Sequence, residues 1–282
     1  MSKRSVFSYF LLCLLSIACR ADIVFDSNTT PAPFLRPGLS TPKDIDMRGN
    51  WSFQNGIGRN PGVFCIFSKP IPVDPAKNYI LSGEFRILNA QSPIKGFNFA
   101  FQPRDAANKS IFVHEVFVVP DSPIGILADD VLDGDTEIFV EGVSWEIPYA
   151  HWVVAFDVKE DMSDLPNRNC SPRIIMESSV LRENVLQLQF SRPLQGSYPK
   201  GTKVRLHSDG PTYQYVAQGA QPGEEWVKWS GVIRGMHPAG KIGPDKWYQG
   251  TKSANIIFRC FDAGMTGATF EFRNIQVEEN IP

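Results

Sequence analysis

Apolar and polar residues alternate along most of the chain. Between Phe97 and Gln102 every second residue is Phe, and the residues between them are polar or small. A period of two turns one face of a strand toward a core and the other toward solvent. Glycine- and proline-containing turns separate such segments. The same pattern predicts strands at 63–67, 79–87, 110–119, 213–217, 226–233, 256–261 and 268–277.

These segments predict an all-β protein whose antiparallel strands form a jelly-roll β-sandwich. No segment has a sustained apolar period of 3.6 residues, and one short helix is expected at 177–184. In the last strand the apolar phase changes, because Phe270 and Phe272 share one face whereas Ile275 falls on the other. One extra residue at Arg273-Asn274 returns Ile275 to the core, so we predict a β-bulge there.

Residues 123–207 differ from the segments on either side. A tight-turn signal at Asp133-Gly134-Asp135 introduces a short strand-like run at 136–140, and further short runs follow. We therefore predict a small β subdomain at 123–207. It is inserted between the first half of the sandwich, at 22–122, and the second half, at 208–282.

The first 21 residues have the pattern of a secretion signal. Lys3 and Arg4 precede an apolar run at 6–18 that is too short to span a bilayer, and small residues offer cleavage sites. Residues 15–19 also resemble a bacterial lipoprotein box, so lipidation of Cys19 remains open. The sequence predicts a secreted, periplasmic or cell-surface protein. Membrane attachment is expected only through a lipidated Cys19.

Composition and charge narrow the function classes. The chain has 282 residues, 43% of them hydrophobic, which is enough for a sizeable core. Loss of the signal removes three basic residues and no acidic one, so the formal net charge changes from −2 to −5. Nucleic-acid binding normally needs a basic surface, and we expect no nucleic-acid partner. A local basic site for an acidic polymer remains compatible with this charge.

Cysteine chemistry leaves two interpretations open. Beyond the signal the chain has three cysteines: Cys65, Cys170 and Cys260. Cys65 and Cys260 both lie in strand-like runs, where they form either a disulfide or two buried thiols. No CxxC pair is present, and a zinc site is not expected.

Three segments of the two flanking halves resemble a known family. Residues 79–85 (YILSGEF), 225–231 (EWVKWSG) and 268–277 (ATFEFRNIQV) resemble strands of the carbohydrate-binding modules attached to xylanases and cellulases. The resemblance implies a galactose-binding-like jelly roll that binds a glycan without catalysis. Members often hold a structural calcium with acidic residues where Arg273 and Asn274 stand here. Arg273 cannot ligate a cation, so no cofactor is expected and a structural calcium there is doubtful.

Sugar recognition calls for flat aromatic faces and planar polar side chains. The aromatic candidates lie in loop-like segments or on strand faces: Trp51, Tyr213, Tyr215, Trp229, Trp247 and Tyr248. The polar candidates lie on the polar faces of predicted strands: Arg86, Asn98, Gln102 and Arg259. Trp226 and Trp229 fall on opposite faces of one strand, and the family comparison makes Trp226 the structural one. Ordinary core packing for the aromatics, and a solvated sheet face for the polar residues, are the alternatives.

Signals of catalysis are weak. The four histidines show no metal-binding spacing, and no nucleophile elbow or phosphate-binding loop is present. The acidic residues of 129–137 do not follow the EF-hand spacing and fit a solvated turn better than a calcium loop. The leading hypothesis is therefore an exported glycan-binding protein. The alternatives are a structural or protein-interaction component of the cell envelope and a polysaccharide-cleaving enzyme. Four aromatics decide between the first two: if Trp51, Tyr213, Tyr215 and Trp247 are scattered or buried, the structural alternative is preferred over glycan binding.

Overall fold

The computed structural model describes residues 22–29, 34, 52–146, 151–175, 180–182, 184–210 and 213–280. The predicted signal segment, Cys19 and Trp51 lie outside these residues. The structure is nearly all β, with 48% of residues in strands and 3% in helices, which confirms the all-β prediction. Among the described residues, no helix is long and apolar enough to cross a membrane.

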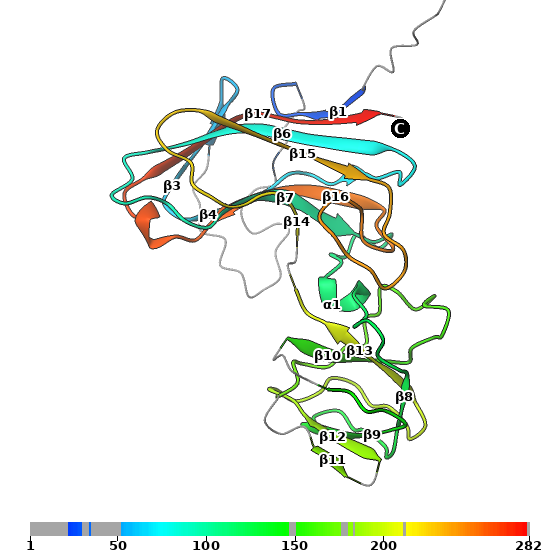
Figure 1. Ribbon diagram of the computed structural model, residues 1–282. Helices are drawn as coiled ribbons and strands as arrows, with labels where there is room; N and C mark the ends of the chain where they lie inside the picture. The colour runs from blue at the N-terminus through cyan, green and yellow to red at the C-terminus, as the bar shows by residue number, and fades with distance from the viewer. Residues whose placement is uncertain are drawn as a thin grey trace, which may run out of the picture.

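Two antiparallel sheets form a sandwich, drawn in the upper half of Figure 1. Sheet 1 contains, in spatial order, β15 (Val227–Arg234), β6 (Asn78–Leu88), β17 (Thr269–Asn280), β3 (Ile57–Pro61) and β2 (Ser52–Gln54), with β1 (Asp22–Asp26) beside β17. Sheet 2 contains β14 (Gln214–Ala220), β7 (Phe97–Arg104), β16 (Ser253–Cys260) and β4 (Phe64–Phe67), with β5 (Ile71–Pro72) beside β16.

Phenylalanine fills the core between sheets 1 and 2. Phe85 of β6 meets Phe97 and Phe99 of β7 across the sandwich, with ring centroids 5.0 and 4.7 Å apart. All three side chains are fully buried, and each stabilises the fold by ~1.5–3 kcal/mol. Gly58 of β3 makes room for Phe272, because a Cβ at Gly58 would lie 1.9 Å from that ring.

Strand β17 changes phase where the sequence predicts it. Its pairing with β6 shifts register between Arg273 and Gln276, and Asn274 adopts a φ of 50°. Phe272 before the shift and Ile275 after it are both fully buried. The predicted β-bulge is confirmed: one extra residue keeps the apolar side chains on the core face.

Cys65 and Cys260 lie on adjacent strands but on opposite faces of sheet 2. In the pairing of β4 with β16, Cys65 is opposite Arg259 and Cys260 is opposite Phe64. Successive residues of a strand face opposite sides, so Cys260 lies in the sandwich core and Cys65 in a separate cluster on the outer face. The two cannot bond to each other, and both are buried free thiols.

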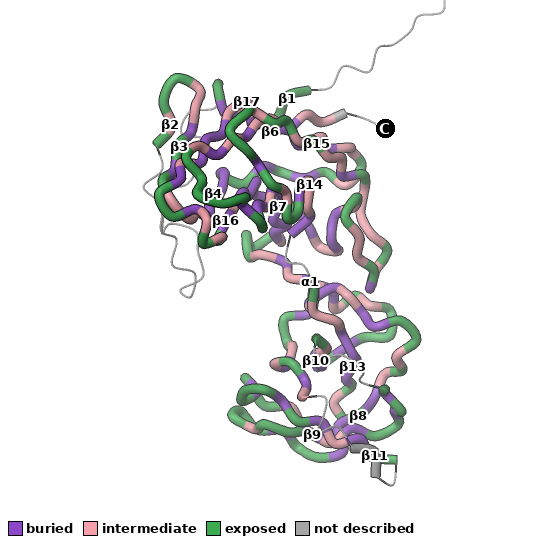
Figure 2. The backbone as a smooth tube through the Cα atoms, turned by 60° about the vertical axis from the view of Figure 1, so that its left-hand side comes forward, coloured by how far each residue is buried: buried purple, intermediate pink, exposed green. Residues whose placement is uncertain are grey.

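Every strand of a third sheet lies between Gly125 and Ser208. Sheet 3 contains, in order, β10 (Trp152–Phe156), β13 (Lys203–Ser208), β8 (Gly125–Leu127), β9 (Glu137–Glu141), β12 (Val185–Gln189) and β11 (Val180–Arg182). It surrounds an apolar cluster of its own, which includes Ile138, Phe156 and Leu188. Figure 2 shows buried positions both between the sandwich sheets and within sheet 3.

Residues 169–175 close sheet 3 on itself. The amide of Ile174 donates to the carbonyl of Trp152 in β10 (2.9 Å), and the amide of Ile175 donates to Gln189 in β12 (2.7 Å). This segment therefore lies between β10 and β12 and satisfies backbone groups of both strands.

The two connections between the sandwich and sheet 3 run side by side. The amide of Val119 donates to the carbonyl of Leu206, and the amide of Ser208 donates to that of Phe117, both at 3.0 Å. His207 is fully buried at this junction, with its Nδ1 2.7 Å from the carbonyl oxygen of His114.

Two local predictions are wrong. The segment 110–119 contains the short helix α1 (Val113–Val116) instead of a strand. Glu115 accepts a hydrogen bond from the amide of Phe112 (2.9 Å) and is held by Arg168 from sheet 3 (2.5 Å), so a tertiary contact fixes the turn. The segment 177–184, expected as a helix, contains β11, whose pairing with β12 satisfies its backbone.

Candidate functional site

Five of the predicted site residues lie on the outer face of sheet 2. Because Phe97, Phe99 and Phe101 face the core, the intervening residues of β7 face outward. Register then places Asn98 opposite Arg259 and Tyr215 opposite Ala100. The sheet-2 outer face, as the name is used below, consists of Asn98, Gln102, Tyr213, Tyr215 and Arg259 together with Phe261.

Arg259 organises this face. Its guanidinium carbon lies 4.9 Å from the ring centroid of Tyr213 and 5.8 Å from that of Phe261. A guanidinium over an aromatic face is attracted to the ring quadrupole. The Nε of Arg259 is buried and has no hydrogen-bond partner among the described residues. The face therefore presents a cation that is held against aromatic rings.

The tyrosines remain neutral donors at neutral pH. Burial raises the pKa of Tyr213 to about 12, against an opposing effect of Arg259. Burial likewise raises the pKa of Tyr215. The two rings meet edge to face, with centroids 5.9 Å apart. Tyr213 is 5% exposed, whereas Tyr215 is half-buried and Phe261 is 50% exposed. The accessible aromatic surface thus belongs to Tyr215 and Phe261.

Phe261 was missed by the sequence analysis as a site residue. It follows β16 by one position, two residues after the outward-facing Arg259, and therefore continues the same alternation. The signal was present in the spacing, but a Phe at the end of an apolar strand is typical of a core residue.

Trp247 and Tyr248 are not the solvent-facing loop aromatics that the sequence predicts. Trp247 is fully buried in the sandwich core, where its ring contacts Tyr79 and Phe101 at 5.6 and 5.1 Å. Tyr248 is 2% exposed and packs in the apolar cluster that contains α1. The amide of Trp247 donates to the carbonyl of Gly235. This pairing of the loop turns both rings inward.

The roles of the two tryptophans beside β15 are the reverse of those expected. Trp229 packs against Phe85 and Phe97 at the edge of the core. Trp226 lies on the outer face of sheet 1, with its ring centroid 4.6 Å from the guanidinium carbon of Arg86 and 4.1 Å from that of Arg273. The predicted opposite facing is confirmed, but the choice of the core residue is wrong.

Arg86 is separated from the other candidates and is fully engaged. It lies on the outer face of sheet 1, where it binds Glu271 at 2.6 Å, and Arg59 binds the same carboxylate at 2.5 Å. Arg273 binds Glu84 at 2.8 Å, and Asn274 donates to that carboxylate at 2.9 Å. Arg59, Arg86 and Arg273 of this face therefore each have a carboxylate partner.

Three acidic residues of the segment 129–137 lie in loops, where they accept backbone hydrogen bonds. Asp130, Asp133 and Asp135 each accept a backbone N–H in the loops around β9. In the described part of the chain, no three His, Cys, Asp or Glu side chains gather closely enough to hold a metal ion. At the position where members of the resembled family often hold calcium, Arg273 and Asn274 supply a guanidinium and an amide.

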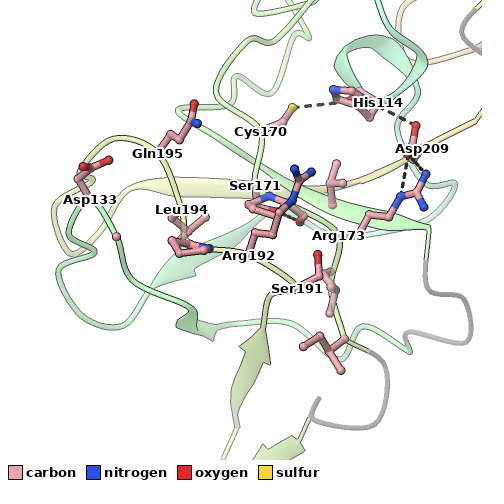
Figure 3. Close-up of a pocket in the computed structure, with 16 residues that line it drawn as sticks. His114, Asp133, Cys170, Ser171, Arg173, Ser191, Arg192, Leu194, Gln195 and Asp209 are labelled. Atoms are coloured by element: carbon pink, nitrogen blue, oxygen red, sulfur yellow. Dashed lines mark hydrogen bonds and ion pairs between the residues drawn. The ribbon is translucent and has the colours of Figure 1, made fainter. Parts of the chain in front are cut away.

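A large cavity lies elsewhere, along residues 170–175 that close sheet 3 (Figure 3). His114 lies 3.5 Å from Asp209 there, and Cys170 is close by. The Cys170 sulfur contacts the backbone oxygen of His114 at 3.6 Å, not its ring. Burial raises the pKa of Cys170 to about 12, so the sulfur stays a thiol. This trio is therefore not an activated cysteine–histidine pair.

Compared with known proteins, the chain matches no family model and no curated protein sequence. The resemblance to carbohydrate-binding modules thus rests on the three quoted sequence segments alone.

Proposed function

We propose that this protein is an exported, non-catalytic glycan-binding protein that holds a polysaccharide or glycan chain against the sheet-2 outer face. One observation carries the proposal: the guanidinium carbon of Arg259 lies 4.9 Å from the ring centroid of Tyr213 and 5.8 Å from that of the exposed Phe261, and no carboxylate among the described residues pairs with it. An arginine beside exposed aromatic surface can donate to the hydroxyls of a sugar that stacks there.

The chemistry of the face matches a sugar ring. The C–H face of a pyranose stacks on aromatic surface, which Tyr215 and Phe261 offer. Its hydroxyls need planar donors and acceptors at the ring edge, which Arg259 and Asn98 offer in directly opposite positions. Gln102, opposite Asn255, is buried and is not available to a ligand. The predicted signal segment supports an extracellular or periplasmic target for this binding.

Binding to a panel of polysaccharides tests the proposal. Phe261→Ala and Tyr215→Ala are each expected to weaken binding of the retained glycan by about 5- to 150-fold, since loss of a stacking ring costs ~1–3 kcal/mol. Leu132→Ala is the matched control, because Leu132 is a 61% exposed apolar residue in sheet 3. Wild-type retention that none of the sheet-2 variants alters would refute the assignment of the site.

A structural or protein-interaction component of the envelope is the second candidate. The burial of Trp247 and Tyr248 and the core position of Trp229 favour it, because those aromatics are unavailable to a ligand. No retention of the wild-type protein on any glycan would favour this candidate over glycan binding.

A further inference from the structure

The cavity beside residues 170–175, here called the seam groove, has a volume of about 1220 Å³. One wall contains His114 and Asp209 from the junction with the sandwich, and the other contains Ser191, Arg192 and Gln195. Small-molecule sites usually enclose ~300–1,000 Å³. An open groove of this size suits an extended ligand of several units.

Arg173 is held in a fixed orientation on one side of the seam groove. Its Nε and Nη2 both donate to one oxygen of Asp209, at 3.0 and 2.6 Å. The other oxygen of Asp209 accepts the amide of Gly210 at 2.8 Å and lies 3.5 Å from His114. Asp209 thus positions the guanidinium, whose side chain is 53% exposed. Across the described residues, the Nη1 donors of Arg173 have no acceptor.

Arg192 lines the same groove as Arg173. Figure 3 shows its side chain in the middle of the groove, near Ser171, with Asp209 and Asp133 at opposite ends. Arg192 is exposed and forms no ion pair within residues 52–146, 151–175 and 184–210. Asp133 accepts the Gly196 amide at 2.8 Å and keeps its negative charge, but it forms no ion pair with Arg192. The lining as a whole has two arginines and two aspartates, and Arg192 is the arginine whose guanidinium the described residues leave free to bind an anionic group.

The lining also indicates how a ligand would be recognised. Apart from the imidazole of His114, no aromatic ring is among the lining residues, so stacking is not the main contact. Ser191 and Gln195 offer hydroxyl and amide groups on the exposed rim. Guanidinium groups match the planar, two-oxygen geometry of a carboxylate.

We propose that the seam groove binds the carboxylate groups of a uronic-acid-containing glycan through Arg192 and the free edge of Arg173. The ligand class rests on the proposed glycan-binding function, but the site is separate from the sheet-2 outer face. Recognition is by charge in this groove and by stacking on that face. The overall net charge is negative, so this local pair of arginines, not bulk attraction, would select the acidic chain.

Calorimetric titration of the full chain with an oligogalacturonate tests this proposal. Arg192→Gln is expected to weaken binding at least tenfold while leaving the melting temperature unchanged, because Arg192 forms no ion pair with any residue that the structure describes. Arg173→Gln is expected to weaken it further. Arg234→Gln is the matched control, since Arg234 is exposed on β15 far from the groove residues in sequence and sheet. The fully methyl-esterified oligomer keeps the same backbone without charge and is expected not to bind in the groove.

Two results would overturn the assignment: equal affinity of wild type and Arg192→Gln for oligogalacturonate, or equal affinity of the wild type for the charged and esterified oligomers. Tighter binding of a sulfated oligosaccharide than of oligogalacturonate would also overturn the carboxylate preference. A failure of the seam-groove proposal can be distinguished from a failure of the proposed function. Phe261→Ala should reduce retention on neutral glycans and leave oligogalacturonate binding intact, whereas Arg192→Gln should do the reverse.

Discussion

The arginines on the outer faces of sheets 1 and 2 have different partners. On sheet 1, Arg59, Arg86 and Arg273 each bind a carboxylate from a neighbouring strand. On sheet 2, Arg259 faces Tyr213 and Phe261, and among the described residues no carboxylate pairs with it. A face whose charges are compensated internally has little left to offer a ligand. The tyrosines beside Arg259 interact with its guanidinium but leave its charge uncompensated.

The largest expected effect concerns the pH at which the sheet-2 outer face weakens. The phenol of Tyr213 ionises near pH 10 in the unfolded chain, and burial raises its folded pKa to about 12. The folded state therefore keeps the phenol proton to a higher pH than the unfolded chain does. The contribution of this group to the free energy of unfolding is complete below pH 10. It falls by on the order of 3 kcal/mol as the pH rises to 12, because each pKa unit corresponds to 1.36 kcal/mol.

Chemical denaturation between pH 8 and 11.5 measures this loss. Tyr213→Phe is expected to reduce the alkaline decline without abolishing it, because burial also raises the pKa of Cys65 and that of Cys170 to about 12. Cys65→Ala in the same background should reduce the decline further and leave the share due to Cys170 and the other buried groups. An unchanged alkaline slope in both variants would contradict the burial of this face.

A smaller effect is expected on the sheet-1 outer face. Glu271→Gln removes the carboxylate shared by Arg59 and Arg86 and should cost about 2 kcal/mol at pH 7, less than for a fully buried pair because both arginines are partly exposed. Burial works to raise the pKa of Glu271, but Arg59 and Arg86 outweigh it and hold that pKa below the ordinary value.

The stabilisation by Glu271 is consequently present above its unfolded pKa and is lost as the pH falls. The difference in unfolding free energy between wild type and Glu271→Gln should therefore shrink in acid, below about pH 4.5. A constant difference from pH 7 to pH 3 would show that packing, not charge, accounts for the loss. The same substitution should leave glycan binding unchanged.

The smallest expected effect is at Trp226. Its ring contacts the guanidinium groups of Arg86 and Arg273, and each exposed contact of this kind contributes ~0.5–1 kcal/mol. Trp226→Ala should cost about 1 kcal/mol in thermal denaturation, and Trp226→Phe should restore part of it. Neither variant should change glycan retention. A loss of retention would place ligand binding on sheet 1 and erase the difference between the two faces.

The fold was largely predictable because a strand records its two faces in consecutive residues. The alternation from Phe97 to Gln102 predicts which side chains lie in the core and which lie outside, and the phase change near Asn274 predicts the bulge. Helix α1 was not predictable in this way, because Arg168, more than fifty residues away, holds Glu115 in the turn. Periodicity also shows that Trp226 and Trp229 face opposite sides without showing which side is the core.

The candidate sites were predictable only in part. Tyr213, Tyr215 and Arg259 share a face because strand register brings them together, and their outward spacing was visible in the sequence. The glycine and proline residues around Trp247 indicate a loop but carry no information on the direction of its ring. The seam groove joins residues from six separate segments of the chain, and no single segment has a pattern that predicts it.

The paired connections to sheet 3 have a consequence for how this protein is engineered and how it could have arisen. Phe117 and Val119 leave the sandwich hydrogen-bonded to Ser208 and Leu206, which return to it. The chain ends created by cutting there lie one strand spacing apart, so a tight turn of a few residues is long enough to rejoin them. The segment between them is in this sense portable: a sandwich can gain or lose it in one genetic event without moving any strand of its own core.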